Sequence, residues 1–176
     1  MADESWDDYV AEAEASGFGE AAPFGTYQVR IESAEAGESS KAHTPLIEVR
    51  AKIVHGDHAG KKATTYPATF YKSNKSAAGK AMFITNMKAF GITGETLVKH
   101  KPTLAQIAAV LPGKVVTIKT GPKKNQDGSV NDEVADMIGT FKPPAEGAVE
   151  VTSFPPVAAA PAQAAAAAGY TSDPGF

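Results

Sequence analysis

Residues 46–54 read LIEVRAKIV, and this stretch decides the fold class. Ile47 and Val49 alternate with charged residues such as Arg50 and Lys52, so apolar and polar side chains follow each other with a period of two. In an extended chain this period places the apolar set on one face and the polar set on the other, which is typical of a half-buried β-strand. The stretch therefore predicts a strand whose charged face lies in water.

The sequence on both sides of this stretch predicts two further strands. Residues 24–34 alternate in the same way, and residues 37–41 between the two runs form a turn of small and polar residues. On the other side, a turn at residues 56–60 leads to a third run at residues 61–71. Pro67 interrupts that run, and a proline in a sheet is confined to edges and bulges because it lacks the N–H that a ladder needs.

The rest of the central region predicts helices followed by two more strands. The expected elements are a helix from Ser73 or Asn74 to Gly91, a helix over 104–110 capped by Thr103, a strand over 114–120, a hairpin turn over 125–128 and a strand over 130–141. Three strands, a helical insertion and two strands is the layout of a five-stranded OB-type barrel, although sandwiches and other small β folds share this order. We expect a mostly β fold with a helical insertion, and the OB-type barrel is the specific hypothesis.

Changes in composition divide the chain into four parts. Residues 1–22 hold seven acids and no base, and Trp6 and Val10 belong to a short apolar stripe of helical spacing. We interpret this part as a flexible acidic N-terminal arm or helix, whose stripe docks on the core or on a partner. The other parts are an OB-type core at 23–143, an Ala/Pro-rich linker at 144–169 and a C-terminal tip at 170–176.

Charge is strongly segregated along the chain. All 17 basic side chains lie between Arg30 and Lys142, although the net charge of the whole chain is −3. Residues 24–142 hold 10 acids, which leaves this region at +7. A basic domain attracts polyanions because their counterions are released on binding. The alternative is that the charge only keeps an ordinary domain soluble.

Composition also excludes several classes of protein. The chain has no cysteine, which rules out disulfides, cysteine-ligated zinc and a thiol nucleophile. No apolar run approaches the roughly 20 residues that span a bilayer. The acidic N-terminus lacks the pattern of a secretory signal. We expect a soluble cytoplasmic protein with no membrane partner, and the sequence leaves open whether it forms a homo-oligomer.

Basic and aromatic residues interleave in the third predicted strand and the start of the first helix. Proteins that bind single strands need this mixture, because cations follow the phosphates while aromatic faces stack on unpaired bases. The candidate nucleic-acid-binding residues are Arg30, Arg50, Lys52, Lys61, Lys62, Tyr66, Phe70, Tyr71, Lys72, Lys75, Lys80, Lys123 and Lys124. The alternative for the aromatic residues is a place in the core or at a barrel edge, and strand alternation predicts that Tyr71 faces away from Phe70.

No pattern of residues predicts catalysis. His55 and His58 flank a turn rather than lie on a helix, and no second cluster completes the four ligands that structural zinc usually has. Neither a Ser-His-Asp order nor a phosphate-binding glycine loop is present. We therefore predict no catalytic residue, no metal site and no cofactor, and we expect a protein that is not an enzyme.

The last residues predict a binding tip. Asp173, Pro174 and Phe176 follow the Ala/Pro linker, and a terminal ring beside a carboxylate suits a small apolar pocket rimmed by basic side chains. The alternative is a C-terminus without a role, which is common.

Several segments carry a resemblance to a known family. They are FGTYQVRI at 24–31, TPLI at 44–47, VHGDHAGKK at 54–62, LPGKV at 111–115 and IGTFKP at 138–143. They resemble a family of small bacteriophage early proteins, which is associated with replication and recombination genes and looks like a single-stranded-DNA-binding protein of OB-type fold. The end DPGF at 173–176 is similar to the acidic tips of bacterial single-stranded-DNA-binding proteins and of their T7-type phage counterpart, which recruit replication and repair partners. It differs from them in having one acid near the tip.

Together these patterns and the resemblance predict a single-stranded-DNA-binding protein of phage replication or recombination, acting in the cytoplasm of a bacterial host cell. It would coat single strands without sequence preference and recruit replication or recombination proteins through Asp173, Pro174 and Phe176. The alternatives are a virion structural or assembly protein, in which a β-domain carries a spacer tail, and an accessory nuclease or nuclease inhibitor. The lack of a carboxylate cluster argues against a nuclease.

Overall fold

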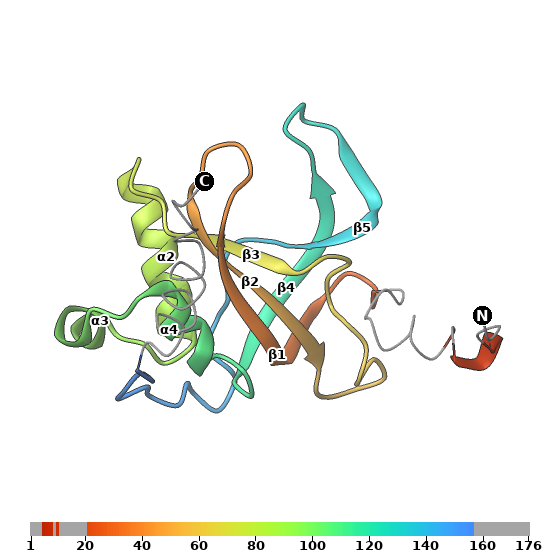
Figure 1. Ribbon diagram of the computed structural model, residues 1–176. Coiled ribbons are helices and arrows are strands. Elements are labelled where there is room, and N and C mark those ends of the chain that lie inside the picture. The colour runs from red at the N-terminus through yellow and green to blue at the C-terminus, as the bar shows by residue number, and fades with distance from the viewer. Residues whose placement is uncertain (1–4, 9, 11–20, 157–176) are drawn as a thin grey trace, which may run out of the picture.

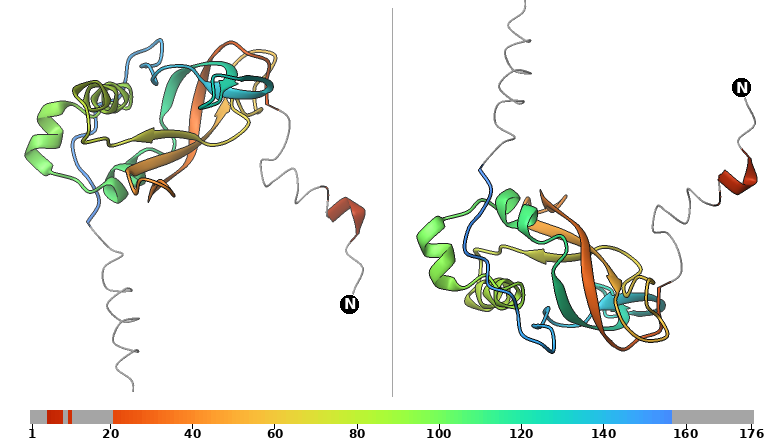
Figure 2. Two further views of the ribbon diagram at one scale, coloured as in Figure 1. Left: turned by 90° about the horizontal axis from the view of Figure 1, so that it is seen from above. Right: turned by 90° about the horizontal axis from the view of Figure 1, so that it is seen from below.

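The computed structural model describes residues 5–8, 10 and 21–156, and Figures 1 and 2 present it from three directions. Five strands and three helices follow residue 21 in this part. In chain order they are β1 (Thr26–Glu38), β2 (Pro45–Ile53), β3 (Ala68–Tyr71), α2 (Ala77–Ala89), α3 (Gly94–His100), α4 (Leu104–Val110), β4 (Val115–Lys124) and β5 (Val130–Met137).

The strands form one antiparallel sheet in the order β3-β2-β1-β4-β5. The alternation of the sequence decides which side chains face the core. Val29 pairs with Ile53 and both are buried, whereas Arg30 pairs with Lys52 and both are exposed. The register between β1 and β2 shifts between Ile31 and Ser33, where a bulge bends β1.

The sheet is open, because no ladder joins its edge strands β3 and β5 in the described part of the chain. Thr65 nevertheless contacts β5: its backbone N–H donates to the Ala135 carbonyl oxygen at 2.9 Å, and the Ala135 N–H donates to Thr65 Oγ1 at 2.9 Å. The mostly β class and the helical insertion between the third and fourth strands are therefore confirmed. The third strand is shorter than predicted, since β3 begins only after Pro67.

The three helices lie together at one end of the sheet (Figure 1). Helix α4 has the predicted bounds, and its capping box explains them: Thr103 Oγ1 accepts from the Gln106 N–H at 3.2 Å, and Gln106 Oε1 accepts from the Thr103 N–H at 2.9 Å. Helix α2 starts later than predicted because Ser76 is its N-cap. Helix α3 was not predicted.

Three phenylalanines from distant parts of the chain meet in the core between the sheet and α2. The ring centroids of Phe70 and Phe90 are 5.7 Å apart, those of Phe90 and Phe141 are 5.1 Å apart, and those of Phe70 and Phe141 are 6.2 Å apart. Phe70 is 4% exposed. Its prediction as a base-stacking residue therefore does not fit this structure, because strand β3 turns its ring inward.

The chain continues past β5 as a strap, residues 143–156, which runs back along the helices (blue in Figure 2). The Val151 N–H donates to the Gly91 carbonyl oxygen at 2.9 Å, and Gln106 Nε2 donates to the Pro155 carbonyl oxygen at 2.7 Å. Val151 is buried. The packed body thus extends beyond the predicted boundary at residue 143. Within the described residues, no helix combines the length and the apolar character that crossing a bilayer requires.

Candidate nucleic-acid interface

Three cationic side chains form a row across the outer face of the sheet. Arg30 on β1 pairs with Lys52 on β2, and Lys52 in turn forms an isolated bridge with Lys62. Residues that pair across antiparallel strands project to the same side. The backbone therefore brings these three cations together, although they are far apart in the sequence.

Arg50 adds a fourth cation two residues along β2, on the same face as Lys52. Partial burial lowers the pKa of the Lys62 amine, and the positive charge of Arg50 lowers it further. Lys62 Nζ donates to the Thr65 carbonyl oxygen at 3.1 Å. An anion placed here would relieve the repulsion between Arg50 and Lys62.

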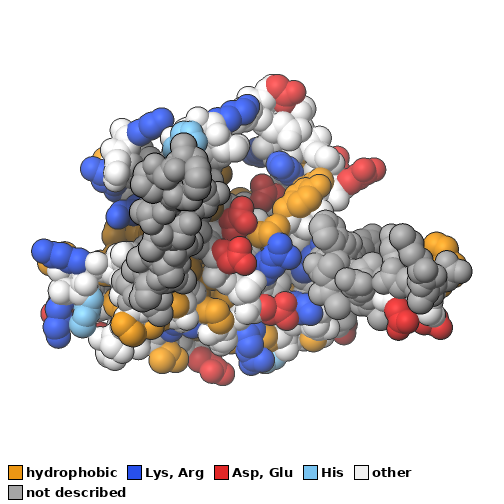
Figure 3. Space-filling model, in the orientation of Figure 1, with side chains coloured by type: hydrophobic (Ala, Val, Ile, Leu, Met, Phe, Trp, Pro, Cys, Tyr) orange, Lys and Arg blue, Asp and Glu red, His pale blue; other side chains and the backbone are white. Residues whose placement is uncertain are grey.

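Acidic residues occupy the same face toward the β1–β2 loop. Glu32 Oε1 lies 3.4 Å from Lys52 Nζ, with both side chains about half exposed. Farther along, Glu35 on β1 pairs with Glu48 on β2. Figure 3 shows red acidic side chains in the middle of this view with blue basic side chains around them. The outer face is therefore basic at the Lys62 end and acidic at the Glu48 end.

An exposed ring borders the basic end. Tyr66 is 57% exposed, and Lys123 Nζ lies 5.5 Å from the centroid of its ring. Tyr66, Lys62 and Phe24 line a cavity of about 770 Å³, which Asp132 and Glu133 also border. The ring lies against a cation and lines the cavity, and its exposed part can contact a planar ligand.

Tyr71 lies at the other end of β2. It is 48% exposed and pairs with Leu46, so its ring is on the outer face, opposite to that of its buried neighbour Phe70. The predicted opposition of these two rings is confirmed. Tyr71 is thus separated from the cation row by the acidic part of the face.

The remaining predicted lysines lie elsewhere. Lys72 and Lys80 line a cavity of about 510 Å³ among the helices. Lys75 precedes α2 and is exposed, as are Lys61 in a turn and Lys124 at the end of β4. The structure therefore divides most of the predicted site residues among the sheet face, the Tyr66 cavity and the helical cavity, and it leaves Lys61, Lys75 and Lys124 outside all three.

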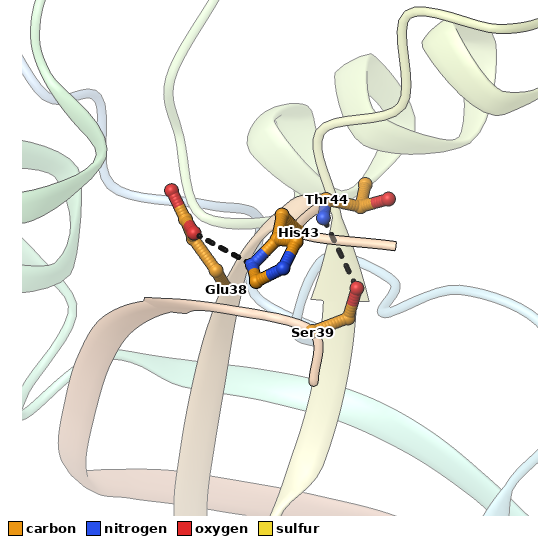
Figure 4. Close-up of polar contacts among 4 residues, drawn as sticks. All are labelled: Glu38, Ser39, His43 and Thr44. Carbon is orange, nitrogen blue, oxygen red and sulfur yellow. Dashed lines mark hydrogen bonds and ion pairs between the residues drawn. The ribbon is translucent and has the colours of Figure 1, made fainter. Parts of the chain in front are cut away.

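The β1–β2 loop is ordered by local polar contacts (Figure 4). The Thr44 N–H donates to Ser39 Oγ at 3.0 Å, and His43 Nδ1 lies 3.5 Å from Glu38 Oε2. His43 has a φ of 49°, which belongs to the left-handed region. This loop adjoins the acidic part of the outer face.

Several functional candidates were missed by sequence reasoning. Lys101 lines the helical cavity beside Lys80, Phe24 lines the Tyr66 cavity, and Lys119 is exposed on β4, paired with Thr26. Lys101 is the C-cap of α3, and the signal for that helix was Thr93, whose hydroxyl accepts from the Thr96 N–H at 3.2 Å. Recognising the cap would have placed Lys101 at a helix end.

Two further predictions concern metals and the tip. No group of three or more His, Asp or Glu side chains could hold a metal ion in the part of the chain that the structure describes. His58, one of the two histidines considered for a metal site, lies edge-on to Tyr27, with ring centroids 6.1 Å apart. Asp173, Pro174 and Phe176 lie outside the described residues.

The fold and the site define a small β-rich domain with an open antiparallel sheet, an inserted helical layer and a partly basic outer face. The chain belongs to the family described as protein of unknown function (DUF669), whose model matches residues 8–164. A search of curated proteins found none that matches this chain.

Proposed function

We propose that this protein binds single-stranded DNA without sequence preference and has no catalytic role. The observation that carries the proposal is the row Arg30–Lys52–Lys62 with Arg50 beside it, next to the exposed ring of Tyr66. The four cations can follow a phosphate backbone, while the ring can stack on a base of any kind. A positive patch beside an exposed ring favours a single strand, because the bases of a duplex are already stacked on each other.

We also propose that the sheet is a partly open OB-type barrel. Its order places β1 at the centre, with β2 and β3 on one side and β4 and β5 on the other. The hydrogen bonds between Thr65 and Ala135 support closure, because they connect the approach to β3 with β5. OB-type domains bind oligonucleotides on the face of their second and third strands. Arg50 and Lys52 lie on that face here, and Tyr71 lies at its far end, beyond Glu48.

The wider role remains a proposal drawn from the sequence. A sequence-tolerant coat on single strands fits replication or recombination in a phage-infected cell. Recruitment of partner proteins is assigned to the tip with Asp173, Pro174 and Phe176, and this proposal rests on the sequence alone.

The test is a titration of a labelled oligo-dT with the full chain at several salt concentrations. For single strands the slope of log affinity against log salt is about −0.7 for each neutralised phosphate. Replacing Arg50 and Lys52 by Gln should weaken binding at low salt and flatten the slope by up to about 1.4, because two phosphate contacts are lost. A duplex of the same length should bind less tightly than the single strand.

The matched control is Lys88→Gln with Lys99→Gln, which removes the same charge from exposed positions on α2 and α3. This control should keep most of the affinity. Equal losses in the two double variants would reduce the proposal to unspecific attraction by net charge. Absence of binding to oligo-dT at low salt would end it.

A further inference from the structure

A cavity of about 510 Å³ lies at the helical end of the molecule, between the end of β3 and the helices α2, α3 and α4. All three helices contribute aliphatic side chains to its lining: Ile84 from α2, Leu97 from α3 and Leu104 from α4. These side chains are only partly buried, so the cavity presents apolar surface to the outside. A cavity of this size and lining can accommodate one bulky apolar side chain of a ligand.

Three lysines surround the apolar lining. Lys72 follows β3, Lys80 lies on α2 and Lys101 is the C-cap of α3, so the cations come from three different elements. All three residues are exposed, and no acid from the described stretches of the chain lines the cavity. Neither of the ion pairs found among the described residues involves these lysines. The described part of the chain therefore leaves the three charges without a counter-charge.

The neighbouring sequence adds positive charge and almost no acid. Residues 61–124 hold 12 lysines and one acid, Glu95. Asn74 lines the cavity just before α2 begins at its N-cap Ser76, and the first turn of α2 contains no acid. The N-terminal end of a helix carries partial positive charge of its own. In Figure 3 blue side chains gather at the left edge, over the helices. A ligand for this cavity therefore combines negative charge with an apolar group.

The lining favours a peptide over a nucleic acid. Base stacking needs an exposed ring face, and the aromatic side chain of this cavity is Phe83, which is 7% exposed. The partly exposed aliphatic side chains of Leu97 and Leu104 instead suit an apolar side chain of a peptide, because apolar surface on both partners leaves water when they meet.

The positions of the lysines indicate where the acids of such a peptide would lie. Because the cations lie on three elements around the apolar lining, acids on both sides of an apolar anchor can each face a lysine. A basic peptide would be repelled here, and an uncharged one would gain only the apolar contact. Complementary charge therefore selects an acidic segment over other peptides with the same anchor.

We propose that the cavity between α2, α3 and α4 is the docking site for an acidic peptide segment of a partner protein. One bulky apolar side chain of the segment packs against Leu97 and Leu104, and the Asp or Glu residues beside it face Lys80 and Lys101. This inference does not depend on the proposed function, because it concerns another surface and another ligand. Where both hold, a partner and a single strand can be bound together, since the cation row and the cavity share no residue.

The probe is the synthetic peptide Asp-Asp-Trp-Asp-Asp with blocked ends, titrated into the full chain by isothermal titration calorimetry. Two matched peptides separate its parts. Asp-Asp-Gly-Asp-Asp should bind about tenfold more weakly or worse, because burial of a large apolar side chain contributes at least that factor. Asn-Asn-Trp-Asn-Asn should also bind more weakly, and its affinity should not fall as the salt concentration rises, because it has no charge to screen.

A pair of double variants tests the lysines. Lys80→Gln with Lys101→Gly should weaken the binding of Asp-Asp-Trp-Asp-Asp several-fold, since each exposed ion pair contributes modestly. Glycine suits position 101, where φ is 46°, and circular dichroism checks the fold. The matched control, Lys88→Gln with Lys99→Gln, removes the same charge from exposed positions on α2 and α3 that do not line the cavity. This control should keep most of the affinity.

Nuclear magnetic resonance of the unchanged chain locates the peptide without any variant. Titration with Asp-Asp-Trp-Asp-Asp should shift the methyl signals of Leu97 and Leu104, because the indole ring would lie against them. The methyl signals of Val130, which is exposed on β5, should stay in place.

Three results would overturn the proposal. Absence of binding by Asp-Asp-Trp-Asp-Asp at low salt would mean that the cavity takes no acidic peptide. Equal losses in the two lysine double variants would reduce the binding to attraction by net charge. Oligo-dT that shifts the methyl signals of Leu97 and Leu104 as strongly as the peptide does would assign the cavity to nucleic acid. None of these results bears on oligo-dT binding at the cation row, which the variants of Arg50 and Lys52 test separately.

Discussion

Tyr66 and Phe70 are four residues apart, yet one ring is at the surface and the other is in the core. In an uninterrupted strand an even separation would place both on the same face. Residues 63–66 before Pro67 are bends and not part of a strand, and β3 begins only at Ala68. Tyr66 therefore lies outside the strand, and the alternation that buries Phe70 does not apply to its ring.

If Tyr66 stacks on a base, its ring matters for binding and its hydroxyl does not. We expect Tyr66→Ala to weaken oligo-dT binding by about 1–3 kcal/mol and Tyr66→Phe to retain most of the affinity. Fluorescence anisotropy with the labelled oligonucleotide measures both. Tyr71→Ala is the comparison, because its ring is also about half exposed but lies beyond the acidic part of the face. A Tyr66→Ala variant that binds like the unchanged protein would exclude stacking at this position.

At the scale of elements, the strap of residues 143–156 depends on one glycine. Gly91 follows α2 with a φ of +82°, and a Cβ at this position would collide with the Val149 carbonyl group. The strap also uses Gly91 as an acceptor, through the Val151 N–H at 2.9 Å. A side chain at residue 91 would therefore push the strap away from the helices.

We expect Gly91→Ala to lower the free energy of unfolding by about 1–3 kcal/mol, because the left-handed backbone alone costs about 1–2 kcal/mol for a residue with a Cβ. Urea unfolding followed by circular dichroism measures the change. Gly94→Ala is the matched control: Gly94 begins α3, and its Cβ would meet no atom within 4 Å. This control should be neutral or slightly stabilising. Equal destabilisation in both variants would contradict the role given to the strap.

At the scale of the whole molecule, charge is separated by sequence position and again by surface. The fold places Lys52 and Lys62 in the cation row of the sheet and Lys72, Lys80 and Lys101 at the helical cavity. Acidic Glu35 and Glu48 lie on the outer face toward the β1–β2 loop. A change in the protonation of a lysine at one of these places therefore changes polyanion binding at that place.

Lys62 predicts a pH dependence of DNA binding. Its pKa is lowered by burial and by Arg50, so the amine loses its charge at a lower pH than an ordinary lysine does. The attraction to phosphate is present below this lowered pKa and is lost as the pH rises through it. Affinity for oligo-dT should therefore begin to fall at a lower pH than the titration of an ordinary lysine would predict.

Lys62→Arg should remove this early fall, since a guanidinium stays charged throughout that range. Lys52→Arg on the neighbouring strand is the control and should retain the fall. Titrations of both variants at a fixed ionic strength and increasing pH compare them. Identical pH profiles for the two variants would exclude Lys62 as the group responsible.

Much of the fold could be predicted from particular residues. The alternation in residues 46–54 predicted β2 and its charged face, and Thr103 predicted the start of α4. Helix α3 was missed because its sequence, GETLVKH, has only Leu97 and Val98 as large apolar residues and so shows no apolar period, although Thr93 caps it. The strap was missed because the Ala/Pro composition beyond residue 143 resembles a linker, and its packing depends on distant partners such as Gly91 and Gln106.

The sequence by itself determined the strand class, the segregation of charge and the set of candidate cations, because periods and charges are local properties of the chain. Only the tertiary structure decided which cations are neighbours, since Arg30, Lys52 and Lys62 meet through strand pairing, and pairing joins residues that are distant in the sequence. It also decided that Phe70 is core and that Lys101 shares a cavity with Lys80. Burial and proximity depend on how the elements pack together, and no single segment contains that information.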